Sequence, residues 1–530
     1  MTNGNFDTFP ARGDFDRAYA GGAVQLVWTK LVADLETPVS AYLKLTEGAT
    51  ATAAGKKQGM TFLLESVEGG AVRGRYSIIG LRPDLIWRAH GNKAEINRDP
   101  LNSPEAFVAE TAPTLEALRA LLAESRLEVP EGLPPMAAGV FGYMGYDTIR
   151  LIEKLPHQRP DVLGVPDAIL MRPTLIVIFD AVRDEMTVVT PVRPGRGATA
   201  VGAYDAALTR LGTVVQALEA PVPEAVRRPA DVAPTAEPVS NTTPEEYREM
   251  VVRAKEYVAA GDVFQVVLSQ RFSTPFTLPP FQLYRALRRT NPSPFLFHLD
   301  FGGFSLVGSS PEILVRVRNG EVTIRPIAGT ARRGATAAED QHLAEALLAD
   351  PKERAEHLML LDLGRNDVGR VAEIGSVEVT ERFLVERYSH VMHIVSNVIG
   401  RLDAKNHDAI DALMAGFPAG TVSGAPKVRA MQIIDELEKD KRGPYAGCVG
   451  YFSADGQMDT CIVLRTGLVK DGVLHIQAGA GLVYDSIPEN EQQECINKAK
   501  ALVRAAEEAV RLAGKRMNPR PPGDNGGTFN

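Results

Sequence analysis

The spacing of apolar residues divides the chain into segments with strand-like and helix-like patterns. Short apolar runs typical of strands cover 61–64, 174–179, 263–271, 295–301, 313–318, 321–326, 449–453, 460–469 and 473–478. Apolar residues three and four apart, typical of helices, cover 200–218, 244–260, 339–349, 351–368, 407–415, 427–439 and 489–514. Gly-containing turns at 319–320 and 471–472 join neighbouring strand-like runs, as in antiparallel hairpins. The pattern predicts an α+β fold with large antiparallel sheets and helices packed outside them.

Changes in composition along the chain indicate its domain organisation. We expect residues 1–23 to form a flexible tail and residues 516–530 to be disordered. The segment 220–241 (APVPEAVRRPADVAPTAEPVSN) lacks periodicity, which is typical of a linker. A helix start follows, because Thr243 can cap, Pro244 takes the first helical position and Glu246 completes a capping box. An N-terminal domain is therefore predicted over 24–219 and a second domain over 242–515.

Composition excludes several classes of function. The 530 residues carry a net charge of −8, from 58 basic and 66 acidic residues, which argues against a general nucleic-acid or acidic-membrane binder. No apolar run approaches the roughly 20 residues that span a bilayer, and the N-terminus lacks the plan of a signal peptide. The three cysteines include no close pair of the kind that binds zinc or forms a redox dithiol. We expect a reduced, cytoplasmic enzyme.

Two pairs of glutamates are the most informative polar feature. Glu353 and Glu356 are three residues apart near the start of one predicted helix, and Glu491 and Glu494 are three apart near the start of another. A three-residue step keeps both side chains on one helix face. If the two faces meet, four carboxylates share a small volume that needs a cation, and hard oxygen ligands suit Mg²⁺. The alternative is that each pair only complements the positive end of a solvated helix.

Several longer strings of sequence carry a family resemblance. They are SSPE at 309–312, PIAGTARRG at 326–334, EHLMLLDLGRND at 356–367, RYSHVMHIVS at 387–396, FPAGTVSGAPK at 417–427, RGPYAG at 442–447, QAGAGLVYDS at 477–486 and ENEQQECINK at 489–498. Through them, over about residues 24–510, the chain resembles the chorismate-utilising enzymes, and most closely their anthranilate-forming large subunits. The resemblance implies antiparallel sheets forming a sandwich flanked by helices, with an intimately packed N-terminal regulatory domain.

The resemblance also implies a binding site for the diacid chorismate and for Mg²⁺. The ring carboxylate would lie on a magnesium ion held by Glu356 and Glu494, with Glu353 and Glu491 as direct or water-mediated ligands, and the metal would act as Lewis acid and template. The residues implied to bind substrate are Gln265, Ala328, Gly329, Thr330, Tyr445, Arg465, Gly479, Ala480, Gly481 and Lys498. Among them, Arg465 and Tyr445 are expected on the enolpyruvyl side and Lys498 near the metal-bound carboxylate. The alternative for Arg465 is an ordinary salt bridge within a sheet.

Three further residues are implied to carry the chemistry. Glu312 occupies the position of the general acid that protonates the departing C4 hydroxyl, so burial or negative charge should raise its pKa. His393 occupies the position of the base that removes the C2 proton, and Thr421 would orient the reacting ring. The alternative for His393 is a core histidine satisfied by hydrogen bonds.

Two positions distinguish the branches of the family. Relatives that form isochorismate or salicylate have a water-activating lysine where this chain has Gln265, and a glutamine cannot serve as that base. Aminodeoxychorismate synthases usually have a nucleophilic lysine where this chain has Ala328. Both differences favour direct addition of ammonia and hence anthranilate, the first committed step of tryptophan biosynthesis. Aminodeoxychorismate synthase component I remains the second candidate.

The resemblance implies one partner protein and one regulatory ligand. No cysteine lies in a Gly-x-Cys-x-Gly nucleophile turn, so we expect a separate glutamine amidotransferase subunit, in a heterotetramer of two large and two small subunits. Tryptophan is expected as a feedback inhibitor where the two domains meet. The residues implied for its site are Ser40, Leu64, Glu65, Ser66, Pro292, Pro294, Phe295, Leu296, Val449 and Tyr451. Simple core packing is the alternative for the leucines.

Overall fold

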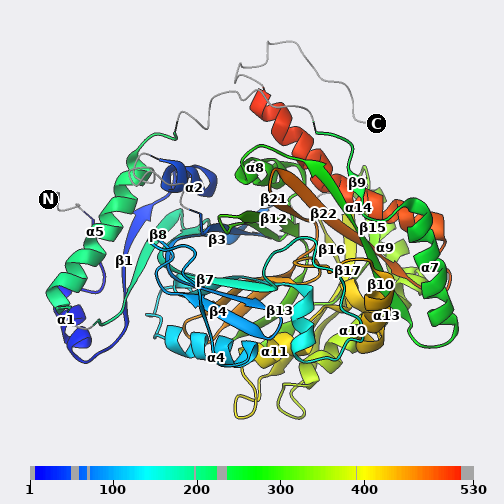
Figure 1. Ribbon diagram of the computed structural model, residues 1–530, viewed down its shortest axis with the longest axis horizontal. Coiled ribbons are helices and arrows are strands. Elements are labelled where there is room, and N and C mark those ends of the chain that lie inside the picture. The colour runs from blue at the N-terminus through cyan, green and yellow to red at the C-terminus, as the bar shows by residue number, and fades with distance from the viewer. Residues whose placement is uncertain are drawn as a thin grey trace.

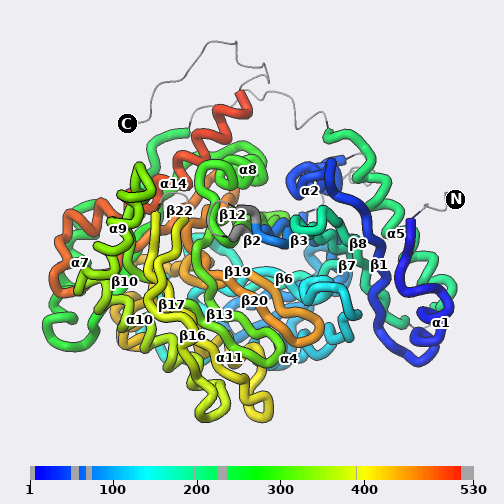
Figure 2. The backbone as a smooth tube through the Cα atoms, turned by 180° about the vertical axis from the view of Figure 1, so that it is seen from behind, coloured from blue at the N-terminus to red at the C-terminus, as the bar shows by residue number. Residues whose placement is uncertain are grey.

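Helices and strands alternate without a βαβ pattern in the computed structural model, which describes residues 6–48, 59–68, 72–195, 198–223, 235–388 and 391–514. The helices are α1 (Arg12–Ala20), α2 (Pro38–Glu47), α4 (Thr114–Ser125), α5 (Ala200–Glu219), α7 (Pro244–Ala259), α8 (Pro280–Thr290), α9 (Ala337–Ala349), α10 (Pro351–Gly369), α11 (Ala409–Gly416), α12 (Gly420–Ser423), α13 (Lys427–Leu437) and α14 (Pro488–Gly514). Short 3₁₀ helices cover Pro135–Ala137 and Tyr146–Leu151. Helices α7 and α14 lie at one end of the molecule and α1 and α5 at the other (Figures 1 and 2).

The strands form one hydrogen-bonded network. They are β1 (Gln25–Val32), β2 (Thr61–Glu68), β3 (Val72–His90), β4 (Lys93–Asn97), β5 (Val108–Ala109), β6 (Gly139–Met144), β7 (Ala168–Asp180), β8 (Glu185–Val192), β9 (Val239–Ser240), β10 (Gln265–Pro275), β11 (Phe295–Asp300), β12 (Phe304–Ser310), β13 (Ile313–Arg318), β14 (Glu321–Ile324), β15 (Ile327–Arg332), β16 (Glu378–Arg387), β17 (Val391–Arg401), β18 (Gly424–Ala425), β19 (Cys448–Ser453), β20 (Met458–Ile462), β21 (Thr466–Lys470) and β22 (Val473–Leu482). The ladders between them are antiparallel. The predicted α+β class with large antiparallel sheets is confirmed, while the division into a sandwich stays a prediction.

Two ladders join the N-terminal part of the chain to the C-terminal part. Strand β2 pairs with β11 from Thr61 to Ser66, and β6 pairs with β19 from Gly139 to Met144. Hydrophobic cores also combine both parts: Leu63 and Ile79 pack with Leu296 and Val307 in one cluster. The N-terminal part is therefore built into the same sheet as the C-terminal part.

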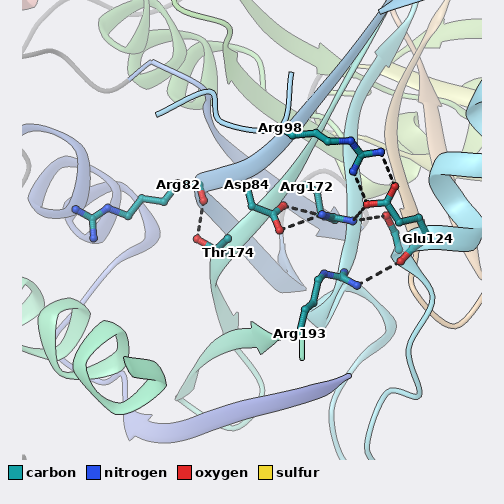
Figure 3. Close-up of polar contacts among 8 residues, drawn as sticks. Arg82, Asp84, Arg98, Glu124, Arg172, Thr174 and Arg193 are labelled. Atoms are coloured by element: carbon teal, nitrogen blue, oxygen red, sulfur yellow. Dashed lines mark hydrogen bonds and ion pairs between the residues drawn. The ribbon is translucent and has the colours of Figure 1, made fainter. Parts of the chain in front are cut away.

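The long strands β3 and β7 bend together near their midpoints. Arg82 has a positive φ of 51°, and the pairing register shifts between Pro83 and Leu85. At the bend, Arg172 donates to both carboxylate oxygens of Asp84 (2.8 and 3.1 Å) and to Glu124 of α4 (3.1 Å), as Figure 3 shows. Arg98 binds the same Glu124 through two further bonds of 2.8 Å, and these bonds hold the pKa of Glu124 low, at about 2. These ion pairs connect the bend to α4. The apolar pattern of the two strands did not predict the bend.

The N-terminal segment differs from its prediction. Residues 1–23 were expected to be a flexible tail, but residues 12–20 form α1, and Phe9 pairs with Trp28. Phe15 is fully buried and packs against Tyr204 of α5, so burial of one aromatic face stabilises the short helix. Within the predicted linker 220–241, residues 235–241 include β9, which pairs with β10. Residues 1–5, 224–234 and the predicted disordered tail 516–530 lie outside the described residues.

Candidate active site

Glu312 is a buried carboxyl group at the junction of β12 and β13. The Thr421 hydroxyl on α12 donates to both of its oxygens at 3.1 Å. Burial raises the pKa of Glu312 to about 8, although Thr421 and the charge of Arg465 both act to lower it. Glu312 is therefore protonated at neutral pH, as a proton donor must be.

Arg465 reaches this site because a strand is interrupted. The run 460–469 was predicted as one strand, but it forms β20 and β21 with a break between Ile462 and Thr466. Arg465 adopts a positive φ of 48° in the break, a conformation that side-chain-bearing residues seldom adopt. Burial lowers the pKa of Arg465, and the Glu312 carboxyl counteracts this effect. The break thus places a guanidinium near Glu312 that a continuous strand would have carried within the sheet.

His393 lies on β17 beside β15, where the pairing register shifts at Gly329 of the PIAGT string. Its Nδ1 is 3.0 Å from the Gly329 carbonyl oxygen and 3.1 Å from Thr330 Oγ1. Because a carbonyl oxygen can only accept, Nδ1 carries the proton and Nε2 keeps its lone pair. Burial lowers the pKa of His393, so the neutral ring is favoured. Ala328 is buried in the neighbouring strand β15, where it pairs with Ile394.

Glu353 of the first glutamate pair lies beside the same irregularity of β15. Gly329 has a φ of 65°, and a Cβ there would lie 3.1 Å from Glu353 Oε2, so glycine allows the carboxylate of α10 to approach. The Thr330 backbone N–H donates to Glu353, while burial and the neighbouring Glu356 raise the pKa of Glu353. Gln265 Nε2 donates to Glu356 Oε1 at 3.0 Å. The predicted substrate residue Gln265 therefore contacts a predicted metal ligand directly.

The second glutamate pair lies at the start of α14. Burial raises the pKa of Glu491, Glu494 raises it further, and the charge of Lys352 on α10 lowers it, which shows that the two helix starts are close. Glu494 forms an ion pair with Lys498 (2.7 Å), and Lys498 also donates to the Gly479 carbonyl oxygen at 2.9 Å. Lys498 thus links the start of α14 to the glycine-rich end of β22, while a site shared by all four carboxylates stays a prediction.

The carboxylate oxygens of these residues fit a magnesium ion whose remaining ligands come from water and substrate. Within the described ranges, no three His, Cys, Asp or Glu side chains are grouped closely enough to hold a metal by themselves. Mg²⁺ commonly takes only one or two protein carboxylates and completes its shell with water and substrate oxygens. Burial is the main cause of the raised pKa values of Glu353 and Glu491, and the neighbouring carboxylates Glu356 and Glu494 add to it. The residues present therefore fit Mg²⁺ without forming a closed cage.

The glycine-rich end of β22 allows close side-chain approach. A Cβ at Gly481 would lie 2.7 Å from Gln265 Nε2, and one at Gly479 would lie 3.0 Å from the Tyr445 hydroxyl. Ala480 between them is buried and pairs with Leu268 of β10. These glycines therefore make room for two predicted substrate-binding side chains.

Two buried ion pairs that support the site were not singled out from sequence. Arg442 and Glu438 form a fully buried pair, in which Arg442 also donates to the carbonyl oxygens of Val267 and Val422 at 2.7 Å. Lys427 and Asp367 form a second pair at 2.8 Å. Three of these four charged residues lie inside the strings RGPYAG, FPAGTVSGAPK and EHLMLLDLGRND, which was the signal that could have found them. The pairs connect α10, α12, α13 and β10 around the site.

A separate cavity of about 730 Å³ lies where the N-terminal and C-terminal strands pair. It is lined by eight of the ten residues predicted for tryptophan: Leu64, Glu65, Ser66, Pro294, Phe295, Leu296, Val449 and Tyr451. Glu65 is paired with Arg288 of α8 through one oxygen at 2.5 Å, and its other oxygen, Oε1, has no hydrogen-bond partner. A buried carboxylate oxygen without a partner is costly unless a ligand or water satisfies it.

Ser40 and Pro292 are not among the residues that line this cavity. The Ser40 hydroxyl accepts from the Thr37 backbone N–H (2.9 Å), and the Thr37 side chain accepts in return from Ser40 N, which forms a capping box at the start of α2. The place of Ser40 and Pro292 in a tryptophan site therefore stays a prediction. Ser66 on β2 supplies the serine at the cavity wall.

Comparisons with known proteins agree with this arrangement. Residues 70–504 match the family described as chorismate binding enzyme. Anthranilate synthase component 1 of Cereibacter sphaeroides is 57% identical over 504 residues, covering 95% of this chain and 99% of the relative. The crystal structure of anthranilate synthase component I from Streptococcus pneumoniae is 40% identical with a TM-score of 0.72, covering 81% of this chain and 92% of that one.

A more distant structure shares the fold alone. The menaquinone-specific isochorismate synthase of Escherichia coli has a TM-score of 0.68 at 20% identity, covering 92% of this chain and 95% of that one. Among the described residues, no helix is long and apolar enough to cross a membrane. The site geometry, the match over most of the chain and the 57% identical relative lead to one conclusion: this chain belongs to the chorismate-binding enzymes, in the group of the anthranilate synthase component 1 proteins.

Proposed function

We propose that this chain is the large subunit of an anthranilate synthase, which converts chorismate and ammonia to anthranilate, pyruvate and water. The observation that carries the proposal is a pair of titratable groups with opposite protonation states. Glu312 holds its proton at neutral pH, whereas His393 is held in its neutral form with Nε2 unprotonated. A site with one acid and one base suits a reaction that loses a hydroxyl group and a ring proton.

The two groups act at different stages. Ammonia attacks C2 of the ring as the C4 hydroxyl departs, and Glu312 gives that oxygen its proton, so that water leaves. His393 Nε2 then removes the C2 proton while the enolpyruvyl group leaves C3 as pyruvate, and the ring becomes aromatic. Thr421, which donates to Glu312, orients the acid. Arg465 and Tyr445 bind the enolpyruvyl carboxylate, because a diacid needs local positive charge and hydroxyl donors in a chain of net charge −8.

Mg²⁺ is the proposed cofactor. Glu356 and Glu494 would hold it, with Glu353 and Glu491 as direct or water-mediated ligands, and the ion would supply Lewis-acid polarisation of the ring carboxylate. Lys498, which lies between Glu494 and Gly479, adds positive charge on the same side. The backbone at Gly329, Thr330 and Gly479 to Gly481 completes the walls of the substrate site.

Two side chains favour ammonia as the nucleophile. Gln265 donates to Glu356 and carries no basic group that could deprotonate water. Ala328 offers no amine that could attack C2. Aminodeoxychorismate synthase component I is the second candidate, since its reaction uses the same substrate.

Ammonia would come from glutamine through a separate amidotransferase subunit. Relatives named component 1 imply a component 2, and a heterotetramer of two large and two small subunits is our proposal for the assembly. Tryptophan would act as a feedback inhibitor in the cavity lined by Ser66, Glu65 and Tyr451. The unpartnered Oε1 of Glu65 is the acceptor that an amino-acid ammonium group would use.

The test is a product analysis with purified chain. Chorismate, Mg²⁺ and ammonium should yield fluorescent anthranilate and an equal amount of pyruvate, the latter measured with lactate dehydrogenase. Aminodeoxychorismate without pyruvate, or isochorismate, would reject the assignment.

Glu356→Ala should lower kcat by at least about a hundredfold, because the variant removes a proposed metal ligand and the partner of Gln265. Asp362→Ala is the matched control: it removes an exposed carboxylate of the same helix α10, whose partner is Arg365, and should leave turnover unchanged. Full activity of Glu356→Ala, or of the parent chain with excess chelator, would contradict the metal proposal.

A further inference from the structure

Tyr388 separates the cavity from the active site. Its buried side chain lines the cavity together with Pro311 and Ile327, which are the chain neighbours of Glu312 and Ala328. On its other side, the Tyr388 ring contacts the His393 imidazole edge-on, with centroids 5.5 Å apart and an angle of 62° between the rings. The Tyr388 ring is therefore a part of the boundary between the cavity and His393.

The backbone and hydroxyl of Tyr388 are both fixed. Its N–H donates to the Val391 carbonyl oxygen at 2.8 Å, and its own carbonyl oxygen accepts from Arg333 at 2.5 Å. The hydroxyl donates to Glu386 Oε2 at 2.9 Å, and Glu386 in turn accepts from Arg325 at 2.6 Å. With the backbone held on one side and the hydroxyl on the other, the ring has little freedom to move away from His393.

His393 is held between two kinds of contact. Nδ1 is anchored by Gly329 and Thr330, and this anchor alone would allow the imidazole to rotate about the hydrogen bond. The ring of Tyr388 blocks that rotation through packing. Together the two contacts fix the direction of the Nε2 lone pair.

We propose that Tyr388 is a positioning residue for His393: its ring holds the imidazole in the orientation that a base needs and keeps the water of the cavity away from it. The inference rests on the proposed role of His393 as the base. It assigns a role to a side chain that contacts neither the reacting ring nor the proposed metal ligands. A base misdirected by even about 1 Å loses much of its rate advantage.

The surroundings of His393 predict how its pKa would change if the Tyr388 ring were removed. Burial has the largest effect on the pKa of His393 and lowers it, the hydrogen bond with Gly329 raises it, and Arg465 lowers and Glu386 raises it by smaller amounts. Replacing the Tyr388 ring by a smaller apolar side chain opens the imidazole to the cavity and reduces that burial. The pKa of His393 should then rise toward its ordinary value.

The chain supplies a matched control pair of an aromatic ring and a histidine, five residues before Tyr388. Phe383 of β16 packs edge-on against His357, with centroids 4.7 Å apart and an angle of 68°. His357 is buried, bonded to Ser396 (2.6 Å) and has a pKa lowered to about 4 by burial. Phe383→Leu therefore imposes the same chemical change on a histidine that has no proposed role in the reaction.

The experiment combines kinetics with histidine NMR on the full chain. Tyr388→Leu should lower kcat by about tenfold or more while KM for chorismate changes less than about threefold, because the ring orients the base and does not bind substrate. Tyr388→Phe, which keeps the ring, should restore kcat to within about threefold. Phe383→Leu should keep kcat within about twofold of the parent chain.

The NMR titration separates positioning from general loosening. In Tyr388→Leu the midpoint of His393 should move to higher pH, whereas in Tyr388→Phe and Phe383→Leu it should stay at that of the parent chain, with the resonance assigned through His393→Gln. Full kcat in Tyr388→Leu, or an equal shift of the His393 midpoint in Phe383→Leu, would overturn the proposal. If the parent chain makes anthranilate, such a failure leaves the proposed function intact; if the parent chain makes none, the function fails and this role with it.

Discussion

At the residue scale, the site is defined by two opposite pKa shifts: burial raises the pKa of Glu312 and lowers that of His393. Loss of water disfavours the charged form of either group, so the acid keeps its proton and the imidazole stays neutral. Neighbouring charges only modify the result: Arg465 favours the carboxylate of Glu312 and disfavours the imidazolium of His393. One apolar surrounding thus prepares both an acid and a base at the same pH.

This arrangement predicts the pH profile of kcat/KM for chorismate. The rate should fall as pH rises through about 8, where Glu312 loses the proton it must donate. At low pH the rate should fall only when the pH drops below the ordinary pKa range of histidine. The reason is that the pKa of His393 is lowered, and protonation of its ring removes the base.

Steady-state rates between pH 5 and 10 with saturating ammonium provide the measurement, with rates corrected for the ammonia fraction. Glu312→Gln should lower kcat by about a hundredfold or more, and its residual activity should lack the limb near pH 8. An alkaline limb that persists in this variant would show that another group controls it.

The amino-acid sequence predicted these residues unevenly. Glu312, His393 and the glutamate pairs lie in strings with a family pattern, so the residue types and their order are enough to single them out. Tyr388 lies in the string RYSHVMHIVS as well, yet its contact with His393 depends on the pairing of β16 with β17 and on the adjacent cavity. Residue types reveal candidate acids, bases and metal ligands, whereas they do not reveal which side chains pack together in the fold.

At the scale of single elements, interruptions decide which side chains reach the site. The apolar run 460–469 predicted one strand, because periodicity does not reveal a positive φ at a residue other than glycine. The break at Arg465 turns its guanidinium toward Glu312. The helices were predicted more closely, since α10 and α14 begin and end within a residue or two of the expected bounds.

The positions of Ser66 on β2 and Ser40 on α2 predict that only Ser66 should affect inhibition by tryptophan. Ser66 lies on β2 next to a register shift between Glu65 and Val67 and lines the cavity. Ser40 is occupied by the cap of α2 and lies outside the lining. Ser66→Phe should therefore raise the tryptophan concentration for half-inhibition by about tenfold or more, because an aromatic ring fills part of the cavity.

Ser40→Phe is the matched comparison and should change half-inhibition by less than about twofold, with a small loss of stability of about 0.5–2 kcal/mol from the lost cap. Inhibition of the rate with ammonium is the readout. A strong effect of Ser40→Phe with no effect of Ser66→Phe would reject the cavity as the tryptophan site.

At the scale of the whole molecule, the two parts of the chain complete each other's sheets. Strand β11 has β2 as a neighbour along its full length, and β19 has β6. Without the N-terminal part, both strands would present open edges with Phe297 and Val449 exposed, and open apolar edges favour aggregation. The fold class could be predicted from apolar spacing, but this sharing could not, because it depends on pairing between segments more than two hundred residues apart.

A chain beginning at residue 242 should therefore not fold alone. We expect little soluble protein and no cooperative unfolding in urea, followed by circular dichroism. Co-expression of 6–223 with 242–514 should restore soluble material, since it returns both neighbouring strands. A soluble 242–514 fragment with a sharp unfolding transition would contradict the shared-sheet interpretation.

The two ladders that join the parts also restrict how the molecule can move. A hinge requires two bodies connected by a few flexible residues, whereas here each body is held to the other by paired backbone along β2–β11 and β6–β19. Rotation about a hinge would break these hydrogen bonds, but a change in sheet twist would preserve them. A ligand that changes the shape of the cavity would therefore twist the common sheet, and the strands that flank Glu312 and Arg465 would twist with it.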